Sequence, residues 1–205
     1  MNEEMPTVFV VDDDSAVGDS IRMLLRSVGI QSEVFLSARA FLQDYDPDRA
    51  GCLVLDVRMP GMSGIDLQKR LQEMESRLPI IFVTAHGDVP MAVDAVKAGA
   101  VDFIQKPFRD QELLDKIQEA LEFDSRIRAK EAELGEIRAR LDTLTERESE
   151  VMELVVDGQP HKHIARALGI SQRTVEIHRA RVMEKMKVRS VSLLVQLVMK
   201  ARSGS

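Results

Sequence analysis

The sequence of 205 residues contains one cysteine, one tyrosine and no tryptophan. A single cysteine rules out an internal disulfide, and nothing clusters with it to suggest a zinc site. No apolar run approaches the ~18 residues that a membrane-spanning helix needs. The stretch MNEEMPT at the start also lacks the basic residues that open a signal peptide. We therefore expect a cytoplasmic protein with no membrane partner.

Charge is distributed unevenly along the chain, although the net charge is only −6. Residues 145–205 carry 11 Lys and Arg against 7 Asp and Glu, which leaves −10 for residues 1–144. Within residues 158–205 the excess is larger, with 10 basic against 2 acidic residues. An acidic first part and a basic end predict two domains, of which only the second suits a polyanion.

Short apolar runs alternate with helical patterns through the first half of the chain. Such alternation implies βαβ units with right-handed crossovers around a parallel sheet. The expected architecture is a flavodoxin-like α/β fold with strand order 2-1-3-4-5. The predicted strands are residues 7–11, 31–35, 52–56, 79–84 and 101–105, and the predicted helices are residues 15–28, 37–45, 65–74, 89–98 and one that begins near Arg109.

The helix that begins near Arg109 has no obvious end, because no proline follows between Pro107 and Pro160. Its apolar residues repeat every seven positions, which favours a helix that pairs with its copy in a dimer. A solvated helical linker is the alternative, and Gly135 favours it because glycine inside a helix costs ~1 kcal/mol. The repeat consists of Ala120, Ile127, Leu134 and Leu141 in one row and Phe123, Lys130, Ile137 and Leu144 in the other, with Lys130 as the break.

Four helices are predicted in the last 60 or so residues, which form an all-α unit. Thr145 followed by Glu148 is the pattern of a capping box at the start of the first. The next three span residues 161–168, 171–186 and 191–200. Two helices joined by a tight turn that contains glycine are typical of a helix-turn-helix unit.

Chemically active residues stand at the ends of the predicted strands. Asp12 and Asp13 follow the first strand, Asp56 ends the third, Thr84 ends the fourth and Lys106 follows the fifth. Because the carboxyl ends of parallel strands share one edge of a sheet, we expect these side chains to converge. Three carboxylates repel one another, and Mg²⁺ suits a site of carboxylates, waters and a phosphate oxygen. In such a site Asp56 would attack a phosphoryl group, Lys106 would hold its oxygen and Thr84 would donate a hydrogen bond to it.

Each of these residues also has a simpler explanation when it is taken alone. Asp13 or Asp14 could cap the helix that begins at Ser15, and for Asp14 this role is favoured. Lys106 could be a surface charge, and Thr84 an ordinary strand residue. The occurrence of all these positions at successive strand ends favours a chemical site.

Residues 7–122 resemble a response-regulator receiver domain, and the motifs VVDDD, LDVRMPGMSG, VTAHGD and DFIQKPF carry the resemblance. It implies that Asp56 is the phosphoacceptor for a sensor histidine kinase. It further implies that Asp13, Asp56 and the backbone carbonyl of Arg58 bind Mg²⁺ or Mn²⁺, with Asp12 assisting through water.

The same resemblance implies a conformational switch. Thr84 and Phe103 match a pair whose hydroxyl and ring reorient together when the acceptor is phosphorylated. Lys106 and Pro107 match a pair whose peptide bond is often cis. We expect phosphorylation to reshape the face of the fourth helix, fifth strand and fifth helix, and to favour a homodimer.

Residues 144–200 resemble the LuxR/FixJ type of DNA-binding domain, through LTERESEVMELVVDG and KHIARALGISQRTVEIHRARVMEKMKV. The whole chain is thus similar to two-component response regulators of the FixJ/NarL family. Residues 172–186 would be the recognition helix in the major groove, with Val175, Val182 and Met186 facing the core of the domain.

The outward face of the recognition helix predicts which residues touch bases. Arg173 could reach guanine, Glu176 could accept from a cytosine amino group, and Ile177 could touch a thymine methyl group. For His178, base contact is about as well supported as packing or a phosphate contact. Candidates for phosphate contacts, which position a protein without specifying sequence, are Lys162, Thr174, Arg179, Lys185 and Lys187.

The combined expectation is a receiver domain over residues 1–122, a helical and possibly coiled-coil linker over 123–143 and a helix-turn-helix domain over 144–205. Phosphorylation would control dimerisation, promoter binding and transcription by RNA polymerase, with no enzymatic activity beyond self-phosphorylation and self-dephosphorylation. One alternative is a Mg²⁺-dependent phosphatase or phosphotransferase, for which the short loops leave little room. The other is a constitutive DNA-binding protein whose first domain only dimerises, which the complete acid set argues against.

Overall fold

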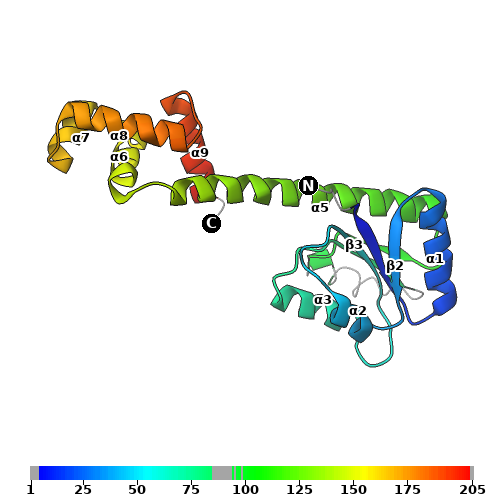
Figure 1. Ribbon diagram of the computed structural model, residues 1–205. Coiled ribbons are helices and arrows are strands. Elements are labelled where there is room, and N and C mark those ends of the chain that lie inside the picture. The colour runs from blue at the N-terminus through cyan, green and yellow to red at the C-terminus, as the bar shows by residue number, and fades with distance from the viewer. Residues whose placement is uncertain (1–4, 85–93, 95, 98, 204–205) are drawn as a thin grey trace. The chain divides into compact units, whose positions relative to one another are not determined.

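A computed structural model of the chain describes residues 5–84, 94, 96–97 and 99–203. They fall into two compact units, Met1–Ile127 and Arg128–Ser205 (Figure 1). Of the predicted helix over residues 89–98, only residues 94, 96 and 97 are described, and all three are helical. The rest of that prediction lies outside the described residues. None of the described helices is long and apolar enough to cross a membrane.

The first unit is built on a parallel sheet of five strands in the order β2-β1-β3-β4-β5, as predicted. Each strand end lies within one residue of the predicted position. The strands are β1 (Thr7–Val11), β2 (Gln31–Phe35), β3 (Gly51–Asp56), β4 (Ile80–Thr84) and β5 (Asp102–Gln105).

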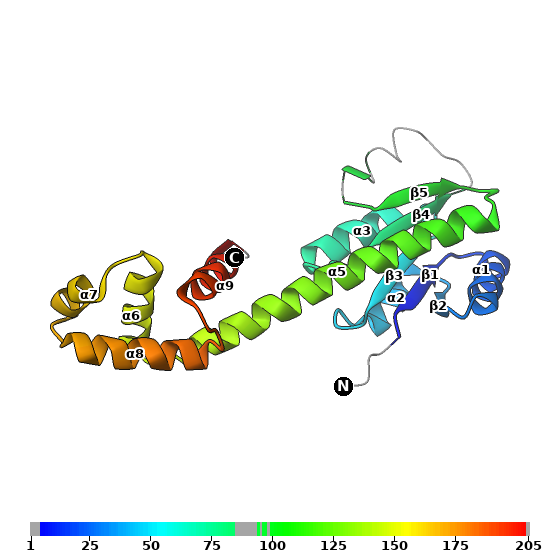
Figure 2. The same ribbon diagram turned by 90° about the horizontal axis from the view of Figure 1, so that it is seen from above.

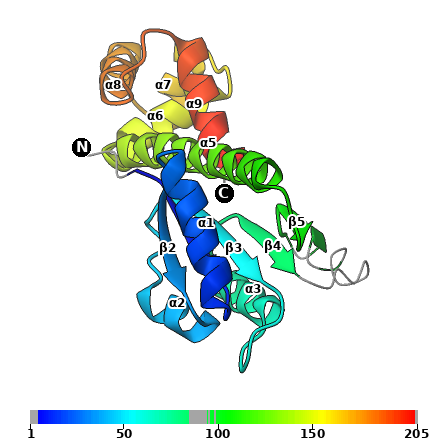
Figure 3. The same cartoon turned by 90° about the vertical axis from the view of Figure 1, so that its right-hand side faces the viewer.

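Helices cover both faces of this sheet, so its central strands are apolar on both sides. Helix α1 (Ser15–Ser27) and the first part of α5 (Asp110–Asp142) lie along one face, and α2 (Ala38–Asp44) and α3 (Gly64–Glu73) along the other (Figures 2 and 3). Side chains alternate between these layers. In β1, for example, Val8 and Val10 pack in the core beneath α1 and α5, whereas Phe9 and Val11 pack in the core beneath α2 and α3.

Local signals set where these helices begin. The Asp14 carboxylate accepts a hydrogen bond from the backbone N–H of Ala16, which confirms the capping role favoured for this residue. Ser37 caps α2 in the same way, by accepting from the N–H of Ala40. Asp13 is thereby left without a capping role.

The second unit contains the four predicted helices around one core. They are α6 (Glu146–Val156), α7 (His161–Leu168), α8 (Gln172–Lys185) and α9 (Val191–Ser203). The predicted capping box is present: Glu148 N–H donates to Thr145, and Thr145 N–H donates to the Glu148 carboxylate. The turn between α7 and α8 passes through Gly169 at φ 65°, a left-handed conformation that glycine adopts without strain.

Helix α5 is one continuous helix, and its heptad residues serve both units. Ala120 is buried in the core of the first unit. Ile137 is buried in the core of the second, where Leu141 and Leu144 also pack. Most of the apolar repeat is thus explained by packing within the chain, and the repeat alone no longer argues for a coiled coil.

Candidate phosphoryl site and DNA-reading surface

A lysine and two buried carboxylates meet at the carboxyl edge of the sheet. The Lys106 ammonium donates to Asp12 Oδ2 at 2.6 Å and to Asp56 Oδ1 at 2.9 Å. Asp12 is 3% exposed and Asp56 7% exposed, so both ion pairs are shielded from water. Lys106 is 94 positions from Asp12 and 50 positions from Asp56 in sequence. The three side chains meet because the strand ends converge, as predicted.

Strand register explains this geometry. Val11 pairs with Leu55, so the next residues, Asp12 and Asp56, leave the sheet side by side. Alternation then directs both side chains to the face that carries α1 and α5. Lys106 reaches them from β5, and its backbone N–H donates to the Thr84 carbonyl at 2.8 Å. The Lys106–Pro107 peptide bond is cis, as the resemblance implied.

The loop after β3 holds the second oxygen of Asp56 in place. The backbone N–H of Arg58 donates to Asp56 Oδ2 at 2.7 Å. At the end of this loop, the N–H of Gly64 donates to the Val57 carbonyl, and a Cβ at Gly64 would lie 2.2 Å from the Asp56 carbonyl oxygen. Glycine is therefore required where α3 passes the acceptor strand.

Burial and ion pairing oppose each other in this cluster. Burial raises the pKa of Asp12 above its ordinary value, even though Lys106 and the N–H of Asp14 both donate to its carboxylate. Burial by itself lowers the pKa of Lys106, but hydrogen bonds to Asp12 and Asp56 outweigh it, so this pKa lies above its ordinary value. Lys106 is therefore a fixed cation at neutral pH, held between the Asp12 and Asp56 side chains.

Asp13 lies exposed beside a hollow of about 490 Å³, which the loop after β3 forms with the start of α3. Among the described residues, no three acidic, histidine or cysteine side chains gather into a ready metal site. Mg²⁺ normally keeps several waters and needs only one or two carboxylates with a phosphate oxygen. The oxygen donors of Asp12, Asp13 and Asp56, with the Arg58 carbonyl, fit such an ion.

Thr84 and Phe103 lie on adjacent strands, on the opposite face of the sheet from Lys106. Thr84 is 5% exposed and ends β4. Phe103 is partly buried against the core that contains Leu55 and Phe82. The pair is therefore placed where a change at the carboxyl edge could reach an aromatic side chain, and the segment that follows Thr84 lies outside the described residues.

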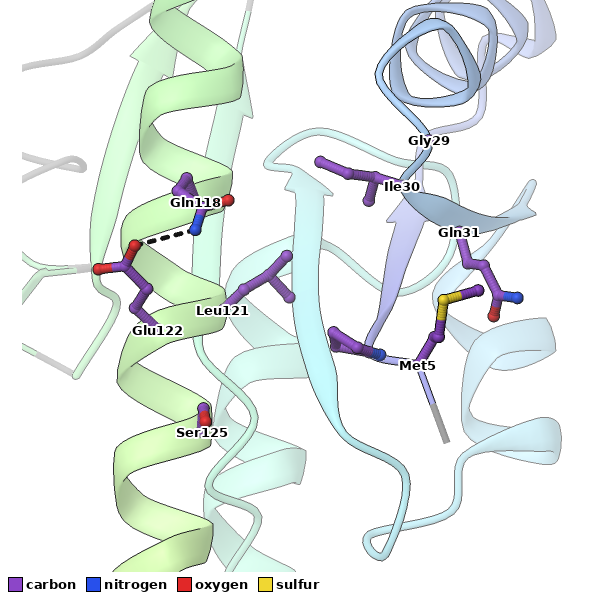
Figure 4. Close-up of a pocket in the computed structure, with 9 residues that line it drawn as sticks. Met5, Gly29, Ile30, Gln31, Gln118, Leu121, Glu122 and Ser125 are labelled. Atoms are coloured by element: carbon purple, nitrogen blue, oxygen red, sulfur yellow. Dashed lines mark hydrogen bonds between the residues drawn. The ribbon is translucent and has the colours of Figure 1, made fainter. Parts of the chain in front are cut away.

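A second hollow of about 330 Å³ lies at the opposite, amino-terminal edge of the sheet, between β2 and α5 (Figure 4). Its walls include Met5, Ile30 and Leu121. The one carboxylate in its lining, Glu122, accepts a hydrogen bond from Gln118. This hollow has no acid and lysine set comparable to that of the carboxyl edge.

In the second unit, α8 has a buried and an exposed side. Val175, Val182 and Met186 are buried, as predicted. The three candidates for base contacts lie on the exposed side, and Ile177 leaves 46% of its surface open to water. An apolar side chain so exposed on a polar helix suits a partner surface with methyl groups. The exposed candidates are Arg173, Glu176 and Ile177.

The surroundings of His178 and Glu176 could not be predicted from the sequence. Nδ1 of His178 is buried and has no hydrogen-bond partner among the described residues, which favours packing over base contact for this side chain. Glu176 lies 3.9 Å from Nδ1 of His161 at the start of α7. The approach of Glu176 to His161 brings α8 next to the start of α7.

The candidates for phosphate contacts differ in their exposure and in the hydrogen bonds that their side chains already make. Lys162 and Lys187 are exposed, and Arg179 is half-buried. Thr174 shares a hydrogen bond with the Ser171 hydroxyl. Lys185 is bound within the unit, because its ammonium donates to Glu148 at 2.6 Å and to the Thr143 carbonyl at 2.8 Å. No sequence pattern indicates the contact between Lys185 and Glu148, which are 37 residues apart.

Comparisons with known proteins agree with both halves of this description. Residues 8–118 match the response regulator receiver domain, and residues 142–199 match the bacterial regulatory proteins of the luxR family. The chain is 45% identical over 197 residues to response regulator protein TmoT of Ectopseudomonas mendocina, covering 96% of this chain and 90% of that protein. It is 47% identical over 199 residues to the transcriptional regulatory protein FixJ of Rhizobium meliloti (strain 1021), covering 97% of each.

Two solved structures are also similar over nearly the whole of this chain. The response regulator StyR has a TM-score of 0.90 and 47% identity, with 96% of this chain and 100% of that one covered. Full-length FixJ from B. japonicum has a TM-score of 0.60 and 45% identity, with 97% and 98% covered.

Proposed function

The chain belongs to the LuxR/FixJ-type response regulators that regulate transcription, and from this premise we propose that Asp56 is the residue that accepts the phosphoryl group. The observation that carries the proposal is the Lys106 ammonium bound to both Asp12 and Asp56. A structural domain gains little from burying two carboxylates at one edge, whereas a phosphoryl acceptor needs a nucleophile and a cation there.

The partner in this reaction is a sensor histidine kinase. A carboxylate oxygen of Asp56 attacks the phosphorus of a phosphohistidine, the P–N bond breaks and an aspartyl phosphate forms. Lys106 then exchanges its contact with Asp56 Oδ1 for one with a phosphoryl oxygen, while the Arg58 N–H holds Oδ2. Asp13, Asp56 and the Arg58 carbonyl, with Asp12 acting through water, would hold Mg²⁺ or Mn²⁺, which would neutralise charge at the phosphoryl group.

The proposed output is transcription control at promoter DNA. The Thr84 hydroxyl turns toward the phosphoryl group and Phe103 follows, which alters the face formed around β5 and α5 and favours a homodimer. Two copies of α8 then read two half-sites, with Arg173, Glu176 and Ile177 at base edges and Lys162, Arg179 and Lys187 at phosphates. RNA polymerase is the further partner, and the cytoplasm, where the promoter lies, is the proposed location.

The proposed domain limits are residues 1–122, 123–143 and 144–205. We propose that the acid set modifies only this chain and does not turn over external phosphate esters. The proposed nucleophile, Asp56, is flanked by the chain's own loop, which already supplies a hydrogen bond to it.

The proposal is tested by incubating the protein with phosphoramidate and Mg²⁺ and measuring its intact mass. We expect one phosphoryl adduct on the wild-type chain and none on Asp56→Asn. Asp66→Asn, which changes an exposed carboxylate ten residues away, is the matched control and should still be phosphorylated. Phosphorylation of Asp56→Asn to the wild-type level would show that another residue is the acceptor.

A further inference from the structure

A buried ion pair in the second unit joins the end of α8 to the start of α6 and to the segment just before it. Glu148 of α6 is 2% exposed, and its Oε2 accepts from the Lys185 ammonium at 2.6 Å and from the Thr145 N–H at 2.9 Å. The same ammonium donates to the Thr143 carbonyl at 2.8 Å. Lys185 is the last residue of α8, and Thr143 directly follows the end of α5.

This geometry conflicts with a phosphate contact by Lys185. An ammonium has three N–H donors, and two of them are engaged within the domain. Turning the side chain toward DNA would leave the carboxylate of Glu148 buried without its cation, which is strongly unfavourable. The hydrogen bond from Lys185 is also the largest reason why the pKa of Glu148 falls to about 2.

Because Lys185 lies at the end of α8, its contact with Glu148 affects how the whole helix is oriented toward DNA. The neighbouring Met186 is fully buried, so the C-terminal end of the helix is fixed on both sides. The base-contact candidates lie two to three turns away on the same rigid helix, roughly 12–18 Å along its axis. A small rotation at the Lys185 end would move their side chains relative to the base edges.

We infer that Lys185 is a positioning residue, which fixes α8 to α6 through Glu148 and to the segment after α5 through the Thr143 carbonyl, and that it is not a DNA phosphate contact. The inference rests on the proposed placement of α8 in the major groove. It assigns to this lysine the alignment of the base-reading side chains, with Lys162 and Lys187 left to contact phosphates.

The wild-type chain permits a direct test by footprinting with an amine-reactive acetylating reagent, with and without a DNA duplex selected from a random pool. We expect Lys185 to react slowly in both states, with less than a twofold change on adding DNA. Lys187, which is exposed, should be protected several-fold by DNA. If DNA protects Lys185 as strongly as Lys187, the lysine contacts DNA and the inference is wrong.

Variants separate positioning from phosphate contact and from folding. A lost phosphate contact weakens binding uniformly across sequences and reduces the salt slope by about 1, and this is expected for Lys187→Met. Lys185→Met is expected to lower the ratio of specific to non-specific affinity about tenfold, with the salt slope unchanged. A partly unfolded protein would lose both affinities equally, so this ratio reports alignment, and circular dichroism at the assay temperature gives the folded fraction.

Two further variants establish that Lys185 acts through Glu148. Lys185→Arg, which keeps a cation within reach of the carboxylate, should restore most of the lost ratio. The double variant Glu148→Gln/Lys185→Met should lose no more than Lys185→Met alone, because the two residues act as one unit. A uniform loss with a reduced slope in Lys185→Met, or an unchanged ratio, would overturn the inference.

Arg173→Ala distinguishes a failure of the underlying proposal. If α8 reads bases, this variant loses specific affinity whatever the role of Lys185. If Arg173→Ala binds the selected duplex as the wild type does, α8 is not the reading helix and the proposed function is at fault instead.

Discussion

The role of a single residue in this protein depends on the groups that lie within a few ångströms of it. Lys106 and Lys185 are both half-buried lysines whose ammonium groups each bind two acceptors. Lys106 faces two carboxylates at the carboxyl edge of the sheet, where we propose that the phosphoryl group binds. Lys185 faces one buried carboxylate and a backbone carbonyl, so its ammonium group stabilises the packing of α8 against α6.

Gly64 gives a prediction at this scale. A Cβ at this position would lie 2.2 Å from the Asp56 carbonyl oxygen, so Gly64→Ala must push α3 away from the acceptor strand. We expect the first unit to lose about 2 kcal/mol of unfolding free energy, in the range of overpacked sites. Urea denaturation measures it, and the phosphorylation rate should fall as well.

Gly135→Ala is the matched control for this substitution. Nothing lies within 4 Å of a Cβ at Gly135 in the interior of α5, so alanine should stabilise the helix by ~1 kcal/mol. Equal stability changes in the two alanine variants would contradict the role assigned to Gly64.

Whole elements are fixed by contacts that cross between them. Helix α5 anchors the first unit through Leu113 and Ile117 and contributes Ile137 to the core of the second. The start of α6 depends on the end of α8, because the Glu148 carboxylate of the capping box also binds Lys185. These elements are stable together and not singly.

The capping carboxylate predicts an acid-sensitive second unit. The pKa of Glu148 falls from 4.5 to about 2, so the folded state binds this proton less readily than the unfolded chain. The resulting stability, at most about 3 kcal/mol, is complete above pH 4.5 and is lost as the pH falls from there toward 2. Thermal unfolding followed between pH 6 and 3 should show it, and Glu148→Gln should remove this part of the pH dependence while lowering stability at pH 7.

Glu146→Gln provides the comparison in the same first turn of α6. Glu146 is exposed, and its substitution should leave the pH dependence of the second unit unchanged. The interpretation fails if both glutamine variants titrate alike.

The end of α5 gives a prediction about packing. Ile137 is 2% exposed within the core of the second unit, and Ile137→Ala should cost that unit about 3 kcal/mol of unfolding free energy. Urea denaturation that resolves the unfolding transitions of the two units would measure the loss of unfolding free energy. Phe123→Ala, at a heptad position that is 42% exposed, should change stability by less than about 0.5 kcal/mol.

At the scale of the whole molecule, charge and packing are divided between the two units. The acidic first part suits a cation and a phosphoryl group, and the basic end suits DNA. Since Ile137, Leu141 and Leu144 pack in the core of the second unit, few heptad residues are left to join two copies. The contact between copies in the proposed dimer therefore has to come chiefly from another surface. The candidate is the face around β5 and α5, which we proposed to change when Asp56 is phosphorylated.

This division predicts the outcome of an oligomerisation experiment. Beryllofluoride with Mg²⁺, which mimics the phosphoryl group, should convert the wild-type chain to a dimer in light scattering. The double variant Phe123→Ala/Ile127→Ala should still dimerise, with a dissociation constant within about threefold of the wild type, since a threefold change is under 1 kcal/mol. A dimer lost in this variant would restore the heptad residues as the main contact.

Much of this protein was determined by its sequence alone. Apolar periodicity and glycine positions predicted the strands, their order and the second-unit helices. Thr145 and Asp14 predicted their caps because capping acts over three residues or fewer. The resemblance of the motifs around Asp56 and Lys106 to receiver domains indicated the family, which the comparisons confirm. The clustering of these side chains was predictable because strand ends in a parallel sheet share one edge whatever their separation in sequence.

Only the tertiary structure decided the roles of Lys185 and of the heptad residues. The pattern that places Ile137 and Leu144 on one stripe of α5 is the same for a coiled coil and for a helix packed on its own domain. Likewise, an exposed phosphate contact and a buried ion pair both require only a lysine near the end of α8. The physical difference lies in which side chain comes within 3 Å, and Glu148 does so through folding across 37 residues, a distance that no local pattern records.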